Sequence, residues 1–194
     1  MRQTERRYPS HTMRKTWSVT FVLSESIRVV SNASPLIYLA KAGRLSLLRE
    51  LYQEVLVPEE VFREAGESGG SPDALVIASA RDDGWIHVTA LEESHMELLA
   101  KSAGIETGEA ASILLARQER VLLLIDDKMG RGAAEVLGIE CLGTVGVLLQ
   151  AVSDSILQYE EFGRVLDRMI DLGFRLDSKV YRRALSIAEK LAEE

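Results

Sequence analysis

Two adjacent aspartates, Asp126 and Asp127, directly follow five apolar residues in the stretch VLLLIDDKMGR, residues 121–131. A short apolar run of branched residues that is bounded by charges is typical of a strand buried on both faces. We therefore expect both carboxylates at the carboxyl end of a strand, where open α/β sheets bind their ligands. Two unit charges about 4 Å apart repel by roughly 4 kcal/mol at an effective dielectric constant of about 20, so further acids gathered here would need a divalent cation.

The same two aspartates also have an ordinary structural explanation. An aspartate that follows a strand can cap the next helix, and a helix is expected to begin near Lys128. The pair alone does not distinguish a metal site from a turn, so other parts of the chain must decide.

A third acid, Glu109, precedes an alanine-rich helix expected over residues 110–117. Thr107 is the expected cap of this helix, and Glu109 falls in its first turn. The helix dipole alone would stabilise a carboxylate there by about 0.3–1 kcal/mol, so Glu109 needs independent evidence before it is assigned as a ligand.

Three more polar residues could join these acids. Glu60 and Glu64 share one face of a helix that opens at Pro58, because their spacing of four residues is close to one helical turn. Asn32 ends the short apolar strand RVVS, residues 28–31. His87 and His95 have no recognised ligand spacing, and a strand position and a helix surface explain them better than a metal.

Short strands alternate with helices along the chain, which predicts a mostly parallel sheet covered by helices on both faces. Ser34 is the expected cap of the first helix, with Pro35 in its first turn. The carboxyl ends of parallel strands lie along one rim, so Asn32 can meet Asp126 and Asp127 there. The expected strands are RVVS (28–31), EVLVP (54–58), WIHV (85–88), VLLLI (121–125) and IECL (139–142).

Composition points to one soluble domain with appendages. The 194 residues, 46% of them hydrophobic, suffice for one good core. The single cysteine, Cys141, excludes a disulfide framework and a cysteine-rich zinc site, and we expect it to be a small buried hydrophobe in a cytoplasmic, reducing compartment. No apolar run approaches the roughly 20 residues of a membrane span, so no membrane partner is expected.

Charge is distributed unevenly. The net charge of -7 argues against a protein that coats nucleic acid by bulk attraction. Residues 1–17 carry five cations against one acid, a charge of +4, which leaves -11 for the remaining residues. We expect a basic, poorly ordered extension over residues 1–26.

Three segments, in this order, resemble a PIN domain: VVSNASPLIYLAKAGRLSLLREL, TGEAASILLA and LLLIDDKMGRGAAEVLGI. They are most similar to a prokaryotic branch related to the VapC toxins of toxin-antitoxin pairs, and GFRLDSKVYRRAL in the tail also fits that branch. The resemblance implies a three-layer α/β/α sandwich over residues 27–153, with residues 154–194 as a C-terminal helical extension. It also implies an endoribonuclease that depends on Mg²⁺ or Mn²⁺.

Carried over position by position, the resemblance implies a specific set of site residues. Asn32 stands where the family usually has an aspartate, and its neutral carbonyl oxygen would bind a cation more weakly. Glu64 is the preferred mid-chain acid, although Glu60 stays open as the alternative. The implied catalytic residues are Glu64, Glu109, Asp126 and Asp127, the implied metal ligands are Asn32, Glu109, Asp126 and Asp127, and the expected nucleic-acid contacts are Ser34, Lys128 and Arg131.

The leading hypothesis is a metal-dependent ribonuclease whose partners are RNA, a small antitoxin protein and a second copy of itself. The rival hypothesis is a PIN-fold nucleic-acid-binding or regulatory module that has lost turnover, and Asn32 is its best support. A phosphate-accepting receiver domain would also explain paired acids, but it would normally carry them after its first strand. The apolar stripes of the tail predict helices that pack on the domain or on a second copy.

Overall fold

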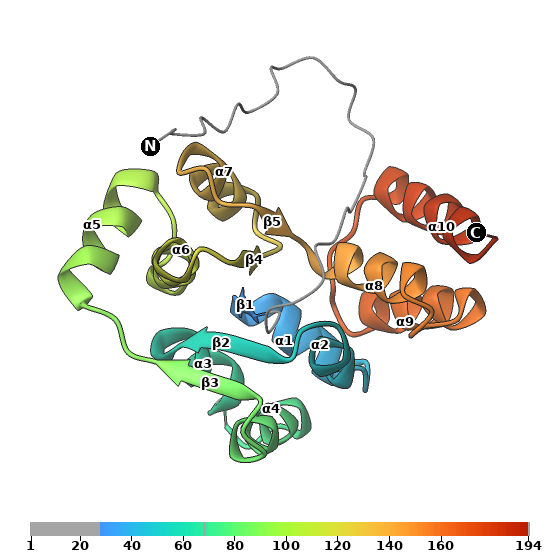
Figure 1. Cartoon of the computed structure of the whole chain (residues 1–194), viewed down its shortest axis with the longest axis horizontal. Coiled ribbons are helices and arrows are strands. Elements are labelled where there is room, and N and C mark those ends of the chain that lie inside the picture. Colours follow the sequence, from blue (N-terminus) through green and yellow to red (C-terminus); the bar gives the residue numbers. More distant parts are fainter. Residues whose placement is uncertain (1–27, 68, 194) are drawn as a thin grey trace, which may run out of the picture.

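The computed structural model describes residues 28–67 and 69–193, and a sheet of five parallel strands lies at its centre (Figure 1). The predicted parallel sheet is therefore confirmed. The basic extension expected at residues 1–26 lies outside the described residues. In sheet order, the strands are β3 (Ile86–Thr89), β2 (Glu54–Pro58), β1 (Arg28–Ser31), β4 (Leu122–Leu124) and β5 (Cys141–Leu142).

Side chains of the inner strands alternate between two hydrophobic cores. In β1, Val29 belongs to one core and Val30 to the other, and in β4 Leu124 and Leu123 divide in the same way. Successive side chains of a strand point to opposite faces of the sheet, and all four of these side chains are buried. The central strands are thus covered on both faces, as their uninterrupted apolar sequences predict.

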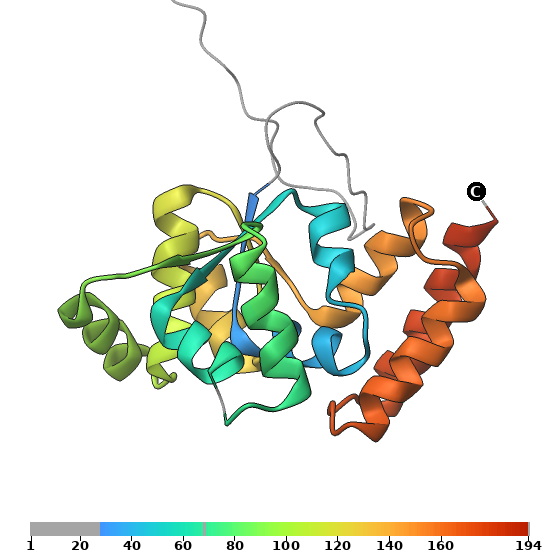
Figure 2. The same ribbon diagram turned by 90° about the horizontal axis from the view of Figure 1, so that it is seen from below.

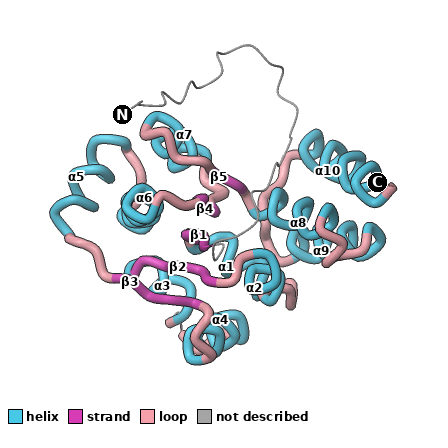
Figure 3. The backbone as a smooth tube through the Cα atoms, viewed as in Figure 1, coloured by secondary structure: helices cyan, strands magenta, loops and turns pink. Residues whose placement is uncertain are grey.

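Helices form the two outer layers of the sandwich (Figure 3). Helices α6 and α7 cover one face, together with Leu99 of α5, and the remaining helices contribute to the core on the other face. The bounds are α1 Ala33–Lys41, α2 Ser46–Leu51, α3 Glu59–Gly66, α4 Pro72–Asp82, α5 Glu93–Ala103, α6 Thr107–Glu119, α7 Lys128–Val136, α8 Thr144–Ser153, α9 Tyr159–Asp171 and α10 Ser178–Ala192.

The tail folds back on the rest of the chain as a hairpin of α9 and α10. Phe162 and Leu166 of α9, and Ala184 and Ala188 of α10, are buried in the same core as α1 and α8. The Tyr38 hydroxyl donates a hydrogen bond to the carbonyl of Gly173 at 3.1 Å, which ties the connection between α9 and α10 to α1. The predicted amphipathic helices therefore pack on the domain itself.

The direction of the strand order reverses between β1 and β4. The chain proceeds from β1 to β2 and β3 on one side, and then crosses to β4 and β5 on the other. A reversal of this kind separates the connections of the two central strands at their carboxyl ends, which is where open α/β sheets bind ligands. Asn32 follows β1 directly, and its backbone N–H donates to the carbonyl of Leu124 in β4 at 2.9 Å.

Two helix starts differ from the prediction. Asn32, not Ser34, caps α1, because the chain is already helical at Ala33 and the Asn32 side chain accepts the Ala33 N–H. Glu106, not Thr107, caps α6, because Thr107 is the first residue of the helix.

Cys141, expected to be a small buried hydrophobe, packs against the core beneath α6 and α7 but is only half-buried. Within the described residues, no helix combines the length and apolar character needed to cross a membrane.

Candidate functional site

Glu109 lies in the first turn of α6 and takes part in a reciprocal capping arrangement. Its Oε2 accepts the backbone N–H of Glu106 at 3.1 Å, and the Glu106 side chain accepts the backbone N–H of Glu109. Burial raises the pKa of the Glu109 carboxyl, the Glu106 N–H partly offsets this, and the nearby carboxylates of Asp127 and Glu106 raise it further. Glu109 is therefore held next to other acids, which favours a bound proton or cation.

Asp127 meets Glu109 from the start of α7. It caps this helix, with Oδ1 accepting the Gly130 N–H at 2.8 Å. A methyl group on Gly130 would lie 2.6 Å from Ile125 Cδ1 and 3.5 Å from Glu109 Cδ, so a larger residue at this position would require the end of the Ile125 side chain to move. We call Glu109 and Asp127 the acid pair; each engages one carboxylate oxygen with a backbone N–H.

Glu64 approaches the first turn of α6 from α3. A methyl group on Gly108 would lie 3.9 Å from Glu64 Oε2. Although Glu64 is exposed as a whole residue, partial desolvation of its carboxyl raises its pKa, and the Glu106 carboxylate raises it further. The structure thus places Glu64 beside the turn that carries Glu109.

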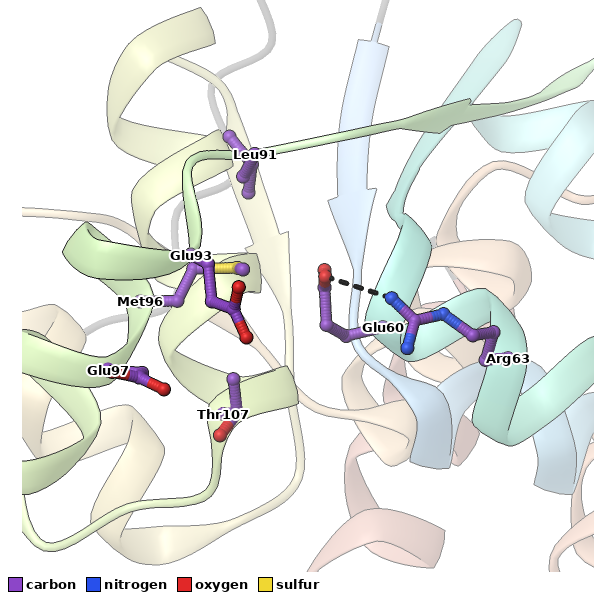
Figure 4. Close-up of a pocket in the computed structure, with 7 residues that line it drawn as sticks. All are labelled: Glu60, Arg63, Leu91, Glu93, Met96, Glu97 and Thr107. Carbon is purple, nitrogen blue, oxygen red and sulfur yellow. Dashed lines mark hydrogen bonds and ion pairs between the residues drawn. The ribbon is translucent and has the colours of Figure 1, made fainter.

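Glu60, the other candidate for the mid-chain acid, lies one turn earlier on α3. Its carboxylate pairs with Arg63 at 3.3 Å (Figure 4). It lines a cleft of about 420 Å³ together with Arg63, Leu91, Glu93, Met96, Glu97 and Thr107. Both glutamates therefore lie near the first turn of α6, Glu60 in the cleft with Thr107 and Glu64 beside Gly108.

Asn32 connects the end of β1 to α6 through its amide oxygen. Oδ1 accepts the Ala33 N–H at 2.8 Å and lies 3.5 Å from the Ser112 hydroxyl, which itself donates to the carbonyl of Gly108 at 2.8 Å. Asn32 is only 8% exposed. Because Ser112 lies one helical turn beyond Glu109, Asn32 is on the same side of α6 as the acid pair.

Asp126 is arranged differently from its neighbour Asp127. Its Oδ1 accepts the Thr144 N–H at 2.8 Å, and its Oδ2 accepts the Thr144 hydroxyl at 2.5 Å, so both oxygens are engaged at the start of α8. Burial raises the pKa of the Asp126 carboxyl, although these two hydrogen bonds and the Arg131 guanidinium act in the opposite direction. Asp126 therefore joins β4 to α8.

Comparison with known proteins identifies the family. A family model, DUF3368, described as a PIN domain, matches residues 28–190, which is most of the chain. The chain belongs to the PIN-domain family. PIN domains are generally nucleases and typically use divalent metal ions. The structure is similar, with a TM-score of 0.45 and 13% sequence identity over 66% of this chain and 92% of the other, to the crystal structure of PAE2754 from Pyrobaculum aerophilum. A search of curated proteins gave no match.

The three expected nucleic-acid contacts of this PIN domain lie in different settings. Ser34 is half-buried in the first turn of α1, whereas Lys128 is exposed at the first residue of α7. Arg131 is turned toward Asp126, and its Nε is buried without a hydrogen-bond partner among the described residues. Lys128 is therefore the more exposed of the two cations, and it directly follows Asp127 of the acid pair.

Three residues of the site were not singled out from the sequence. Glu106 adds a carboxylate beside Glu64 and Glu109, Ser112 contacts Asn32, and Thr144 holds Asp126. The capping-box spacing of Glu106 and Glu109 was a usable signal, since an acid can replace serine in that motif. Thr144 had no local signal, because 18 positions separate it from Asp126.

The donor atoms of the site fit a hard divalent cation in type. Among residues 28–67 and 69–193, no group of three or more His, Cys, Asp or Glu side chains is arranged to hold a metal ion by itself. Magnesium, however, commonly keeps several waters and uses one or two carboxylates together with substrate phosphate. The acid pair and the Asn32 amide oxygen offer only such oxygen donors, so the residues present fit a cation of this class.

Proposed function

We propose that this PIN domain is a metal-dependent ribonuclease that hydrolyses RNA phosphodiester bonds at the acid pair. The observation that supports the proposal most strongly is that Glu109 and Asp127 meet beside Gly130, where a methyl group would lie 3.5 Å from Glu109 Cδ and 3.7 Å from Asp127 Oδ1. The Asp127 carboxylate also raises the pKa of Glu109. Mutual repulsion of close carboxylates is relieved by a proton or a cation. A site for Mg²⁺ or Mn²⁺ explains why the fold retains this unfavourable pair.

The residues divide into proposed roles. Glu109 and Asp127 would each hold the cation with the carboxylate oxygen that does not accept a backbone N–H. Asn32, at the end of the neighbouring strand β1, would add a neutral oxygen. Glu64, on α3, would accept a proton from the attacking water or orient that water. Its raised pKa makes its carboxylate a stronger base than an ordinary glutamate. When bound, the cation would supply Lewis-acid chemistry to the scissile phosphate.

Asn32 sets the strength of this site. An aspartate at this position would bring a third negative charge to the acid pair, whereas the amide brings only a dipole. The proposed enzyme therefore binds its cation less tightly than a relative with an acid there. The same substitution favours the second candidate function, a PIN-fold module that binds RNA with little or no turnover.

One experiment tests the proposal and separates these two candidates. Purified protein is incubated with a mixed RNA pool in chelator, in Mg²⁺ and in Mn²⁺, beside a Glu109→Gln variant and a Glu50→Gln control from the exposed surface of α2. We expect cleavage only with metal, lost in Glu109→Gln and kept in Glu50→Gln. Binding without cleavage in either metal would support the binding module, and cleavage that survives Glu109→Gln would refute the proposed site.

We further propose that the protein is the toxin of a toxin-antitoxin pair and acts as a homodimer. The similarity of its three segments to VapC-related sequences supports both roles, as does the exposed apolar surface on α7, where Val136 is 87% and Met129 is 59% exposed. Induced expression should arrest growth, and a small protein encoded next to it should relieve the arrest. Light scattering at micromolar concentration should give twice the monomer mass, and a monomer mass would contradict the dimer.

A further inference from the structure

The start of α10 carries an unusual local charge. Between residues 172 and 183 there are four cations, Arg175, Lys179, Arg182 and Arg183, against one acid, Asp177, which gives +3 in a chain whose net charge is -7. All four cations are exposed. We call Lys179, Arg182 and Arg183 the α10 cationic face, since their spacing places them on neighbouring positions of one helix surface.

The packing of α10 holds this face toward solvent. Ala184 and Ala188 are buried in the core, and the Tyr181 hydroxyl donates to Asp167 Oδ1 of α9 at 2.7 Å. These contacts fix the rotation of the helix about its axis. The cationic face is therefore presented by a rigid element and not by a loose tail.

Nothing in the described part of the chain neutralises the cationic face by direct pairing. None of its three cations forms an ion pair with a described residue, and the nearby Asp177 carboxylate is engaged in capping α10, where Oδ1 accepts the Lys179 N–H at 2.7 Å. Like charges one turn apart repel, and cations near a helix N-terminus oppose the helix dipole. The arrangement is unfavourable for the isolated helix and suits an anionic ligand.

The cationic face lies at the same end of the sandwich as the acid pair. Helix α8 starts at the carboxyl rim of the sheet and runs away from it, and α9 returns, so the connection to α10 is again at the rim side (Figure 2). Phe174 in this connection is in edge-to-face contact with Tyr38 of α1 at 5.0 Å, and α1 begins beside Asn32. One short helix thus separates the acidic site from the cationic face.

The opposite side of the acid pair would repel a polyanion. The cleft between α3 and α5 is lined by Glu60, Glu93 and Glu97, and its cation Arg63 is paired with Glu60 (Figure 4). Figure 1 shows α5 and α10 at opposite ends of the molecule. An RNA strand seated at the acid pair would therefore extend over α1 toward α10.

We infer that the α10 cationic face binds the phosphate backbone of the RNA strand on one side of the cleavage site. This inference rests on the ribonuclease function proposed above and assigns the tail hairpin a substrate-binding role. Contacts of this kind position the strand without reading its bases. Binding through them weakens with salt, because each neutralised phosphate releases counterions.

The test compares two pairs of substitutions of the same chemistry. Arg182→Gln with Arg183→Gln removes two charges from the cationic face, and Arg49→Gln with Arg117→Gln removes two exposed charges from α2 and α6, which lie toward the other end of the strands. Binding of an end-labelled oligouridylate is measured in chelator across a salt series. Cleavage of the same RNA is measured with Mn²⁺, and Arg182→Lys with Arg183→Lys serves as the charge-conserving rescue.

We expect the cationic-face variant to bind about tenfold more weakly at about 0.1 M salt and to lower the salt slope by about 1.4, or 0.7 for each lost phosphate contact. KM should rise while kcat stays near the wild-type value, and the lysine variant should restore binding. The control pair should match wild type. If both glutamine variants bind and cleave like wild type, the inference fails while the proposed function stands; if wild type neither binds nor cleaves RNA, both fail.

Discussion

Asp126 and Asp127 are neighbours in the chain but belong to two different electrostatic regions. Asp127 is exposed, uses one oxygen to cap α7 and contacts the like-charged Glu109. Asp126 is largely enclosed, uses both oxygens on Thr144 and lies near the Arg131 cation. In the first region two like charges face one another and a cation can relieve their repulsion, whereas in the second both carboxylate oxygens already accept hydrogen bonds from Thr144.

This difference shows that residue type and position alone do not assign a role in such a site. Both aspartates follow β4 at the rim of the sheet, so the sequence alone makes both of them candidate metal ligands. Hydrogen-bond saturation distinguishes them, since a carboxylate whose oxygens both accept strong hydrogen bonds gains less from a cation than one that faces another acid. The comparison predicts different consequences for the two regions.

The largest expected effect is on catalysis by the acid pair. Glu109→Gln or Asp127→Asn should lower cleavage by about a hundredfold to a thousandfold, the scale found when one group that stabilises transition-state charge is removed. Each variant should also lose the rise in melting temperature on Mn²⁺ addition, because metal bound only to the folded state stabilises it by mass action. Asp126→Asn should lose much less activity, and equal losses for Asp126→Asn and Asp127→Asn would erase the distinction between the regions.

The next effect concerns Asn32, where a new charge would extend the acid pair. Asn32→Asp should strengthen Mn²⁺ binding and increase cleavage by about tenfold, because a partly buried carboxylate would add a charged oxygen to the cation site. Without metal the variant should be less stable, by as much as roughly 4 kcal/mol for one close pair of charges. Melting curves with and without Mn²⁺, together with cleavage of one RNA pool, measure both effects. A variant that melts no lower without metal and cleaves no faster with it would show that Asn32 lies outside the acidic cluster.

A smaller effect is expected on the Asp126 side. Thr144→Val keeps the shape of the side chain but removes the hydroxyl, which leaves Asp126 Oδ2 without its donor beside a fully buried residue. Loss of such a hydrogen bond should lower the free energy of unfolding by about 1–3 kcal/mol in urea titrations. Thr144→Ser, which keeps the hydroxyl, should lose less. Cleavage per folded molecule should change little, in contrast to the acid-pair variants.

The sequence predicted the scaffold of the site well because the scaffold depends on local patterns. The runs RVVS and EVLVP match β1 and β2 residue for residue, since each is a continuous apolar stretch that ends at a polar residue or a proline. Once these strands are parallel, topology alone brings Asn32 next to the end of β4. The position of the rim therefore followed from short-range information.

The helix caps and the hydrogen-bond partners of the polar residues could not be predicted in the same way. In the structure Asn32 caps α1 in place of the predicted Ser34, because the backbone becomes helical immediately after Asn32. Several polar residues stand near this helix start, and the sequence alone does not show which of them is the cap. Glu106 displaced Thr107 because its carboxylate and that of Glu109 cap one another's backbone N–H groups. The contact of Asp126 with Thr144 depends on how β5 is placed beside β4, which no local pattern specifies.

The smallest effect is a pH dependence of the metal-free protein. Burial and neighbouring carboxylates raise the pKa of Glu109, and burial raises the pKa of Asp126, so the folded state binds protons at higher pH than the unfolded chain does. Stabilisation from groups with raised pKa is fully present below their unfolded pKa and is lost as pH rises through the folded pKa. In chelator, the melting temperature should therefore rise as the pH is lowered from neutral toward the raised pKa values of these two carboxyls, which lie above the ordinary values of 4.5 for Glu109 and 3.8 for Asp126. With saturating Mn²⁺ the trend should reverse, because protons then compete with the cation for the acid pair. Glu109→Gln should show a weaker rise than wild type, and the α2 surface variant Glu50→Gln should show the full rise. If the melting temperature in chelator instead falls as the pH is lowered, the acid pair carries no electrostatic cost for a cation to relieve.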